Sequence, residues 1–247
     1  MQAYAVTDVG RYRDMNQDYV YSSTAPLGSL DNLFIVADGM GGHNAGDFAS
    51  RFLVENLVEF FQTEYPDKDI HGIIKDGIRK VNRRLYDETC RRPELRGAGS
   101  TLVLATVKGT VLYVANIGDS RLYLLREELE QITKDHSYVE ELVALGKMRR
   151  GSRDYMEKRN IITRAVGTGK DVDTDLFAMK MRPGDTILMC SDGLSNMVDE
   201  FEMEYIIRSE DGLKHKTECL VEAANRSGGK DNISAILIEP EMSEVSV

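Results

Sequence analysis

Three apolar segments in the middle of the chain are separated by short turns that contain glycine. The segments cover residues 100–107, 110–117 and 121–126, and the turns between them are Lys108-Gly109 and Gly118-Asp119-Ser120. Glycine-containing turns between two β-forming segments are hairpin signals. Strands joined by hairpins run antiparallel, so this region predicts an antiparallel sheet.

Helical patterns lie on both sides of this region. Apolar residues recur at steps of four or five within 45–64, and Ile70, Ile74 and Ile78 share one stripe of a second helix predicted over 69–91. Other segments have the composition of strands or of shorter helices. The predicted strands are 4–8, 33–37, 186–190 and 234–238, and the predicted helices are 137–145 and 213–226.

The domain organisation follows from what interrupts these patterns. No linker rich in Pro, Gly or Ser and no repeat breaks the 247 residues, and the 42% apolar content excludes a disordered chain. We therefore expect one domain of sheets covered by helices over residues 1–240, followed by a loose tail at 241–247. The stretch 147–160 is polar, charged and aperiodic, and we interpret it as an exposed, mobile loop.

Charge and cysteine content limit the setting. The 31 Lys and Arg against 41 Asp and Glu give a net charge of −10, which would repel the phosphate backbone of a nucleic acid. Cys90, Cys190 and Cys219 form no Cys-x-x-Cys pair, so a disulfide framework and a thiolate zinc site are disfavoured. No apolar run approaches the roughly 18 residues of a membrane span, and no signal peptide opens the chain. We expect a cytoplasmic protein.

Aspartates stand at the ends of predicted strands. Asp38 and Asp192 each follow an apolar segment and precede a glycine, and Asp119 ends the segment 110–117; Asp18 and Asp231 are further acidic candidates. Several strand ends can converge at one end of a sheet, which would bring these aspartates together. Clustered carboxylates repel one another unless cations neutralise them. Oxygen-only ligands select Mg²⁺ or Mn²⁺. Asp-Gly is also an ordinary turn dipeptide, so spacing alone leaves both a structural turn and a metal site open.

The glycine-rich stretch 38–43 follows a predicted strand and precedes a predicted helix, as a phosphate-binding loop does. It lacks the Gly-Lys-Ser/Thr ending of a nucleotide P-loop, and Asn44 stands where a dinucleotide fingerprint needs its third glycine. Asp38 would also repel a bare phosphate unless a metal lay between them. Arg13, in a polar turn before Asn16, could hold a phosphate with its guanidinium or could be an ordinary surface arginine.

Taken in order, these segments resemble the metal-dependent serine/threonine protein phosphatase family (PPM, or type 2C), and its compact bacterial members most closely. Single motifs of this kind are weak, but so many in the right order are highly specific. The resemblance runs from about residue 2 to residue 239. The matching stretches are Thr7-Asp8-Val9-Gly10 with Arg13 and Asn16-Gln17-Asp18, Asp38-Gly39-Met40-Gly41-Gly42-His43, Gly99-Ser100-Thr101-Leu102, Asn116-Ile117-Gly118-Asp119-Ser120-Arg121, Asp135-His136-Ser137, Ile162-Thr163-Arg164-Ala165, Pro183-Gly184-Asp185, Cys190-Ser191-Asp192-Gly193-Leu194 and Lys230-Asp231-Asn232-Ile233-Ser234.

The resemblance implies an α+β fold, a four-layer αββα sandwich of two antiparallel sheets flanked by helices, with metals at one end. Two cations, Mn²⁺ or Mg²⁺, would sit side by side and share a hydroxide. Asp38 would bridge both of them, and Gly39 would lend its carbonyl oxygen. Asp192 and Asp231 would hold one of the two.

The same resemblance implies further roles around these metals. Asp18 would contact a metal directly or through water, and Asp119 would join Asp192 at a third, weaker metal site. Arg13 would bind the substrate phosphate. The segment 147–160 falls where the family has its flap, a loop that contacts the substrate.

Hydrolysis would follow without a phosphoenzyme. The shared hydroxide would attack phosphorus in line with the departing Ser or Thr oxygen, and the metals and Arg13 would stabilise the charge on the phosphoryl oxygens. The substrates would be phosphorylated Ser/Thr proteins, the opposing enzyme a partner Ser/Thr kinase, and the protein a monomer.

Three positions depart from the family pattern. Gln17 stands where many relatives have Glu, and it would offset less positive charge. Met40 occupies the place of a histidine proposed as general acid in animal relatives; His43 is not assigned that role, and water could protonate the leaving oxygen. Asn196 falls where some relatives have a further acid, which would weaken the third metal site.

Two alternatives to an active phosphatase stay open. The chain could be a non-catalytic relative that binds phosphoproteins as a regulator, although the intact set Asp38, Asp192 and Asp231 argues against a degenerate site. It could also be a glycine-loop nucleotide enzyme, which the missing lysine and the acidic residues disfavour.

Overall fold

The computed structural model describes residues 1–42, 45–65 and 68–241, so His43 and the tail residues 242–247 lie outside the described residues. The strands are β1 Gln2–Asp8, β2 Asp18–Ser23, β3 Leu33–Met40, β4 Gly99–Ser100, β5 Leu102–Lys108, β6 Val111–Ile117, β7 Arg121–Leu125, β8 Leu129–Gln131, β9 Asp175–Lys180, β10 Thr186–Cys190 and β11 Ile233–Glu239. The helices are α1 Ala45–Phe61, α2 Ile70–Arg91, α3 Tyr138–Ala144, α4 Arg153–Lys158, α5 Asp192–Ser195, α6 Glu200–Ile207 and α7 Leu213–Arg226, with a 3-10 turn at Pro93–Leu95.

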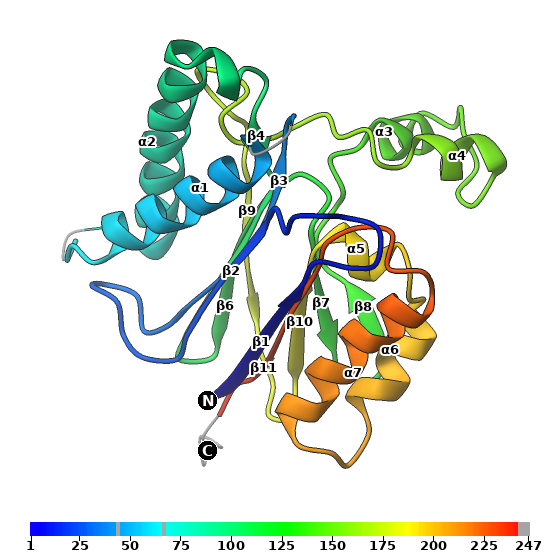
Figure 1. Cartoon of the computed structure of the whole chain (residues 1–247). Helices are drawn as coiled ribbons and strands as arrows, with labels where there is room; N and C mark the ends of the chain where they lie inside the picture. Colours follow the sequence, from blue (N-terminus) through cyan, green and yellow to red (C-terminus); the bar gives the residue numbers. More distant parts are fainter. Residues whose placement is uncertain (43–44, 66–67, 242–247) are drawn as a thin grey trace.

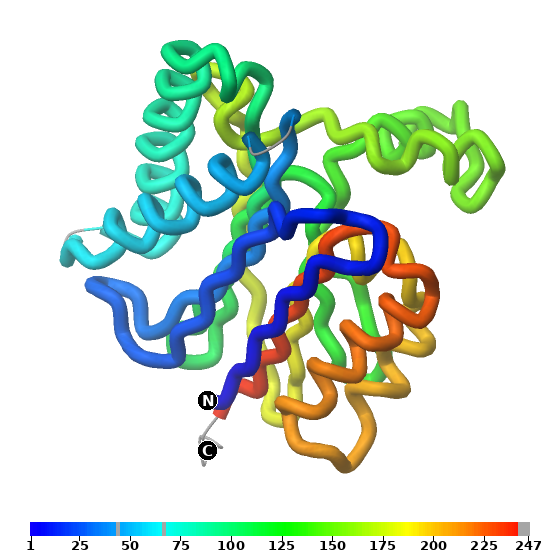
Figure 2. The backbone as a smooth tube through the Cα atoms, in the orientation of Figure 1, coloured from blue at the N-terminus to red at the C-terminus, as the bar shows by residue number. Residues whose placement is uncertain are grey.

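The strands form two sheets. One has the order β1-β11-β10-β7-β8, and the other has the order β2-β3-β5-β6-β9, with β4 paired to β3 beside this path. The pairings described between neighbouring strands are antiparallel. The first and last strands, β1 and β11, lie side by side, as the blue and red ends of the tube in Figure 2 show.

The sheets pack face to face, and helices cover the outer faces (Figure 1). The alternation along β3 explains why: Leu33, Ile35 and Ala37 pack with α1 and α2, whereas Phe34 and Val36 pack between the two sheets. Because successive side chains of a strand point to opposite faces, an unbroken apolar strand requires cover on both sides. The five-stranded sheet is covered in the same way by α6 and α7. The αββα sandwich is confirmed.

The long helices match the predicted ones closely. α1 ends at Phe61 rather than residue 64, α2 begins one residue after its N-cap Asp69, and α7 has the predicted bounds. Ser137 and Leu145 cap α3, and Gly146 follows with a φ of 68° that only glycine adopts freely. Within the described residues, no helix is long and apolar enough to cross a membrane.

One of the two predicted hairpins is wrong. The Lys108-Gly109 turn joins β5 to β6 in one sheet, as expected. The Gly118-Asp119-Ser120 turn instead carries the chain from β6 in one sheet to β7 in the other. Gly118 has a φ of 101°, and a Cβ there would lie 2.7 Å from Cγ2 of Thr101, so glycine makes this sharp exit possible. Asp119 therefore lies between the ends of both sheets.

The interpretation of 147–160 as a loop is also wrong in part, because Arg153–Lys158 form α4. Ser152 caps this helix by accepting a hydrogen bond from the Tyr155 amide at 3.3 Å. None of its residues is buried, so no apolar stripe could reveal it. Together α3 and α4 project from the rest of the fold (Figure 1). The sequence patterns above do not predict β2, β8, β9, α5 or α6.

Candidate metal centre

Aspartates from both sheets surround one cavity at the end of the sandwich. The cavity has a volume of about 240 Å³. Asp38 reaches it from β3, Asp119 from the turn after β6, Asp192 from the start of α5 and Asp231 from the turn before β11. Its other lining residues are Arg13, Gln17, Gly39, Met40, Gly41, Thr101, Asn160, Ile162 and Asn232.

Asp18 lies next to this cavity and links the two sheets. It opens β2, where its Cα partner on β3 is Asp38. Its Oδ2 atom accepts hydrogen bonds of 2.7 Å from the hydroxyls of Ser191 and Ser234, which belong to the other sheet and its continuation. Its Oδ1 atom is buried and has no hydrogen-bond partner among the described residues. One oxygen is thus fixed by the scaffold and the other has no partner in the described part of the chain, but Asp18 is not one of the residues that line the cavity.

The backbone of Asp38 and Gly39 is held tightly. The Asp38 amide donates to Oγ1 of Thr101 at 2.9 Å, and the Thr101 amide donates back to the Asp38 carbonyl at 2.8 Å. A Cβ on Gly39 would lie 2.1 Å from the carbonyl oxygen of Gly46 in α1, so no other residue fits between β3 and the helix. This close approach aims the Asp38 side chain at the other carboxylates.

In Asp192, as in Asp18, one carboxylate oxygen accepts a hydrogen bond and the other has no partner among the described residues. Its Oδ2 atom accepts a 2.9 Å hydrogen bond from the side-chain amide of Asn196, one turn later. Its buried Oδ1 atom has no partner among the described residues. Asn196 therefore orients Asp192 here, in the place where some relatives have an acid. Asp119 is 7% exposed and lies near enough for the two charges to repel.

Arg13 and Asp231 form an ion pair at the rim. Nη2 of Arg13 donates to Oδ2 of Asp231 at 2.7 Å, while Oδ1 of Asp231 accepts from the Asn232 amide at 2.9 Å. Asn232 also donates to the carbonyls of Val9 and Met15 and accepts from the Gln17 amide. Figure 2 shows the result: the blue loop after β1 lies against the orange-red segment before β11. The motif stretch 230–234 contained Asn232, but sequence reasoning gave it no role.

The electrostatics of the cavity disfavour ionised carboxylates. Burial raises the pKa of Asp18 to about 7 and that of Asp192 to about 6. Burial, and then repulsion by neighbouring aspartates, raises the pKa of Asp38 and of Asp119 well above the usual range. Such shifts arise where like charges share a desolvated site, and a bound cation reverses them.

These observations fit a hard divalent cation. Oxygen donors from several elements converge on one cavity, two buried carboxylate oxygens have no partner among the described residues, and the carboxylates repel one another. Within the described residues, however, no three His, Cys, Asp or Glu side chains already have the spacing of a metal site. One of the candidate ligands, Asp231, is paired with Arg13 instead.

A buried histidine supports the Asp119 turn. Nδ1 of His136 accepts a hydrogen bond from the Gly118 amide at 3.1 Å, and the His136 amide donates to the Gly118 carbonyl at 2.9 Å. A ring that accepts at Nδ1 carries its proton on Nε2, which lies 3.1 Å from Oδ2 of Asp175. The motif Asp135-His136-Ser137 was noted in the sequence, but this contact requires the three-dimensional arrangement.

The projecting segment reaches the cavity through its base. Asn160 and Ile162 line the cavity, and Arg159 donates to the Asn196 carbonyl at 3.2 Å. Within the segment, Glu140 of α3 accepts from the Tyr155 hydroxyl of α4 at 2.8 Å. This hydrogen bond joins the two helices, and the base of the segment lies next to the aspartates.

Known proteins are similar to this chain in sequence and in fold. The serine/threonine phosphatase stp of Listeria monocytogenes serotype 4b (strain F2365) is 38% identical over 252 residues, which cover 99% of this chain and 98% of that protein. The crystal structure of the serine/threonine phosphatase Stp1 from Staphylococcus aureus superposes with a TM-score of 0.88 at 33% identity, covering 97% of this chain and 95% of that one.

A second solved structure is that of the catalytic domain of the serine threonine protein phosphatase PstP in complex with 2 manganese ions. It superposes with a TM-score of 0.82 at 34% identity and covers 96% of each chain. The family profile described as Protein phosphatase 2C matches residues 11–237. The chain belongs to the protein phosphatase 2C family.

Proposed function

We propose that this chain hydrolyses phosphoserine and phosphothreonine in proteins, with residues 1–240 as one catalytic domain and Mn²⁺ or Mg²⁺ as cofactor. The observation that carries the proposal is the convergence of buried carboxylates from both sheets on one cavity, with a single guanidinium at its rim. This combination suits phosphate-monoester hydrolysis, because cations held by the carboxylates would offset their charge and, with the guanidinium, attract a phosphate.

The metal ligands in this proposal are side chains and one backbone oxygen. Asp38 would be shared by two cations, with the Gly39 carbonyl beside it, and Asp192 and Asp231 would hold one of them. Bound there, divalent cations supply Lewis acidity, which lowers the pKa of water and offsets phosphate charge. The set of proposed ligands is Asp18, Asp38, Gly39, Asp192 and Asp231, with Asp119 joining Asp192 at a third, weaker site.

The role of Arg13 is to bind and orient the phosphoryl group. A guanidinium matches two phosphate oxygens at once and stays charged at any physiological pH. Its hydrogen bond to Asp231 further raises its pKa. Arg13 is half exposed at the rim, where an entering phosphate meets it first. If Arg13 turned to the phosphate, Asp231 would be available as a metal ligand.

The proton for the departing oxygen comes from water in this proposal. Of the described residues that line the cavity, none is a His, Lys, Cys or Tyr. Met40 stands where a histidine acid would be needed, and its thioether carries no proton. Asn160 and Ile162, at the base of the segment that holds α3 and α4, line the same cavity and support a substrate-contacting flap around 147–160.

The proposal extends to the cellular setting. Reversible phosphorylation requires an enzyme that adds the group, so a Ser/Thr kinase is the opposing partner. The protein would act as a monomer in the cytoplasm on phosphorylated proteins.

Replacing one proposed ligand tests the proposal. In Asp192→Ala, hydrolysis of a phosphothreonine peptide with Mn²⁺ should fall at least about 100-fold while the circular dichroism spectrum stays unchanged. Asp211→Ala is the matched control, because Asp211 is exposed and outside the cavity. Wild-type hydrolysis by Asp192→Ala would refute the ligand assignment. A wild-type protein that binds the peptide without turnover would favour the non-catalytic regulator.

A further inference from the structure

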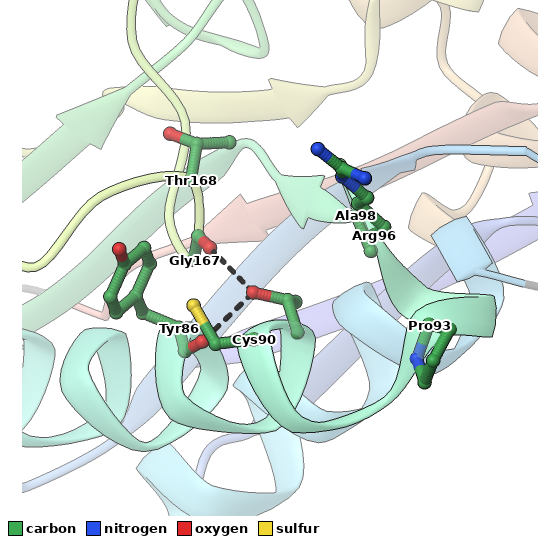
Figure 3. Close-up of a pocket in the computed structure, with 9 residues that line it drawn as sticks. Tyr86, Cys90, Pro93, Arg96, Ala98, Gly167 and Thr168 are labelled. Carbon is green, nitrogen blue, oxygen red and sulfur yellow. Dashed lines mark hydrogen bonds between the residues drawn. The ribbon is translucent and has the colours of Figure 1, made fainter.

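A second cavity lies near the carboxyl end of α2 and is larger than the metal cavity, at about 470 Å³. In Figure 3, Tyr86 and Cys90 rise from α2 on the side that faces Gly167 and Thr168, and Arg96 stands across from them. The lining residues are Tyr86, Thr89, Cys90, Pro93, Arg96, Gly97, Ala98, Gly167 and Thr168.

Hydrogen bonds between α2 and the loop that precedes β9 hold this cavity open. The Gly167 amide donates to Oδ1 of Asn82 at 2.8 Å. The Thr89 hydroxyl shares its one proton between the Tyr86 carbonyl at 2.9 Å and the Gly167 carbonyl at 3.4 Å (Figure 3). Gly167 has a φ of 87° and packs on Leu85, where a Cβ would lie 2.6 Å from the leucine side chain. Nδ2 of Asn82 also donates to the carbonyls of residues 169 and 170. The walls are therefore preformed rather than shaped by a ligand.

The short strand β4 lies between this cavity and the metal centre. Gly99 of β4 pairs with Met40 of β3, which lines the metal cavity. A Cβ on Gly99 would lie 2.8 Å from Cγ2 of Thr168 and 3.1 Å from Cε of Met40, so a side chain from each cavity meets at this glycine. A peptide that runs from the metal cavity toward β4 would bring one of its neighbouring residues to this point, since extended chain advances about 3.3 Å per residue.

The chemistry of the lining is amphipathic with one positive charge. Of the described residues that line the cavity, Arg96 alone is charged, and no ion pair or side-chain hydrogen bond of Arg96 is found within the described part of the chain. By contrast, the arginines of the neighbouring helix α2 (Arg79, Arg83, Arg84 and Arg91) are each paired with an acid. An unpaired guanidinium beside a preformed cavity in a chain of net charge −10 selects a negative partner locally.

We infer that this cavity is a substrate subsite, in which Arg96 receives an acidic side chain, Asp or Glu, that lies a few residues from the phosphorylated Ser or Thr. The inference rests on the proposed function, because it takes the phosphoprotein as the occupant. The aliphatic part of the acidic side chain packs against Tyr86 and Thr168, and its carboxylate meets the Arg96 guanidinium.

The test measures kcat/KM for phosphothreonine peptides that carry Glu, Ala or Lys at each position from four residues before to four residues after the phosphothreonine. Wild-type protein with Mn²⁺ should prefer Glu at one or two adjacent positions by about fivefold over Ala, the effect of one partly exposed ion pair. In Arg96→Glu, the preference at those positions should reverse to Lys. Arg83→Glu, which makes the same charge change on α2 outside the cavity, should keep the Glu preference.

The outcomes separate the two claims. Turnover that is indifferent to Glu, Ala and Lys in both wild type and Arg96→Glu would overturn the subsite and leave the phosphatase intact. No turnover of any peptide or of p-nitrophenyl phosphate would overturn the proposed function and the subsite with it. A Glu preference that survives Arg96→Glu would place the acidic contact elsewhere and would also overturn the subsite.

A blocking experiment gives a second readout. Cys90 lines the cavity and is exposed, whereas Cys190 is buried. Alkylation of Cys90 with a bulky maleimide, in a Cys219→Ser background, should lower kcat/KM for the Glu peptide at least about fivefold and leave p-nitrophenyl phosphate hydrolysis unchanged. Unchanged peptide kinetics after complete alkylation would contradict the subsite.

Discussion

Nη2 of Arg13 lies 2.7 Å from Oδ2 of Asp231 and donates a hydrogen bond to it, so the proposed phosphate ligand and a proposed metal ligand neutralise each other across 218 positions of sequence. The pair is partly exposed, which keeps its strength low enough to open. A cation at Asp231 and a phosphate at Arg13 each replace one half of this pair. Metal and substrate binding are therefore coupled through these two side chains.

Arg13→Ala tests that coupling. The substitution should lower kcat/KM for a phosphothreonine peptide about 100-fold, because two charge-assisted hydrogen bonds to the phosphate are lost. The same change should strengthen Mn²⁺ binding, since Asp231 no longer pairs with a guanidinium. Isothermal titration with Mn²⁺ and steady-state kinetics measure the two effects, and Arg11→Ala, a neighbouring change outside the cavity, is the control. Weaker Mn²⁺ binding in Arg13→Ala would contradict the coupling.

The hydrogen bond from the Asn196 side-chain amide to Asp192 leads to a second prediction. Asn196→Asp places a carboxylate beside Asp192 in place of the 2.9 Å hydrogen bond. In metal-free protein the two charges repel, so the free energy of unfolding should fall by about 1–3 kcal/mol. With millimolar Mn²⁺, binding at the third, weaker site should tighten several-fold and restore the stability. Thermal unfolding with and without Mn²⁺ follows both changes. If Mn²⁺ raised the melting temperature of Asn196→Asp and of wild type by the same amount, that result would count against the third site.

The carboxylate pKa values predict how stability depends on pH without metal. Asp18 titrates near 7 in the folded chain and near 3.9 when unfolded, so the folded state binds more protons between these values. The contribution of Asp18 to the free energy of unfolding therefore falls as the pH rises from about 4 to 7. Urea unfolding in EDTA should show Asp18→Asn gaining stability over wild type across this window. A constant difference between the two proteins would mean that the pKa of Asp18 is not raised.

His136 is a positioning residue in this account, and two near-isosteric changes separate its two ring nitrogens. The side-chain amide of Asn reaches the position of Nδ1, which accepts a hydrogen bond from the Gly118 amide. The longer side-chain amide of Gln reaches the position of Nε2, which faces Asp175. His136→Gln leaves the Gly118 amide unpaired and should cost about 2 kcal/mol of stability, more than His136→Asn. It should also weaken Mn²⁺ binding near Asp119. If His136→Gln and His136→Asn lost the same free energy of unfolding, that result would argue against the Gly118 contact.

Strong periodicity made most of the fold predictable. The helices α1, α2 and α7 bury one face each, and β3, β5 and β10 are apolar on both faces, so their patterns are unambiguous. The strand β2 is partly exposed and contains polar residues, and it was missed. The helix α4 has no buried residue and was read as a loop. Helices and strands that bury few side chains have no clear apolar periodicity in the sequence, so they are difficult to predict.

The site shows the same limit. Asp38, Asp119, Asp192 and Asp231 could be named because each follows or precedes a recognisable strand, and the structure brings them to one cavity. At Gly118 the chain leaves one sheet and enters the other. The sequence could not predict this exit, because the turn has the composition of a hairpin. Contacts between distant segments, such as Ser191 and Ser234 with Asp18, depend on tertiary packing alone.

The most direct test of the central claim is hydrolysis of a phosphothreonine peptide by metal-stripped protein while Mn²⁺ is added stepwise. Activity should be absent at first, rise with Mn²⁺ to saturation, and vanish when EDTA is added in excess. Circular dichroism at each step shows that the protein stays folded. Hydrolysis that proceeds undiminished in EDTA, or folded protein that shows no turnover at any Mn²⁺ concentration, would contradict a metal-dependent phosphatase built on these aspartates.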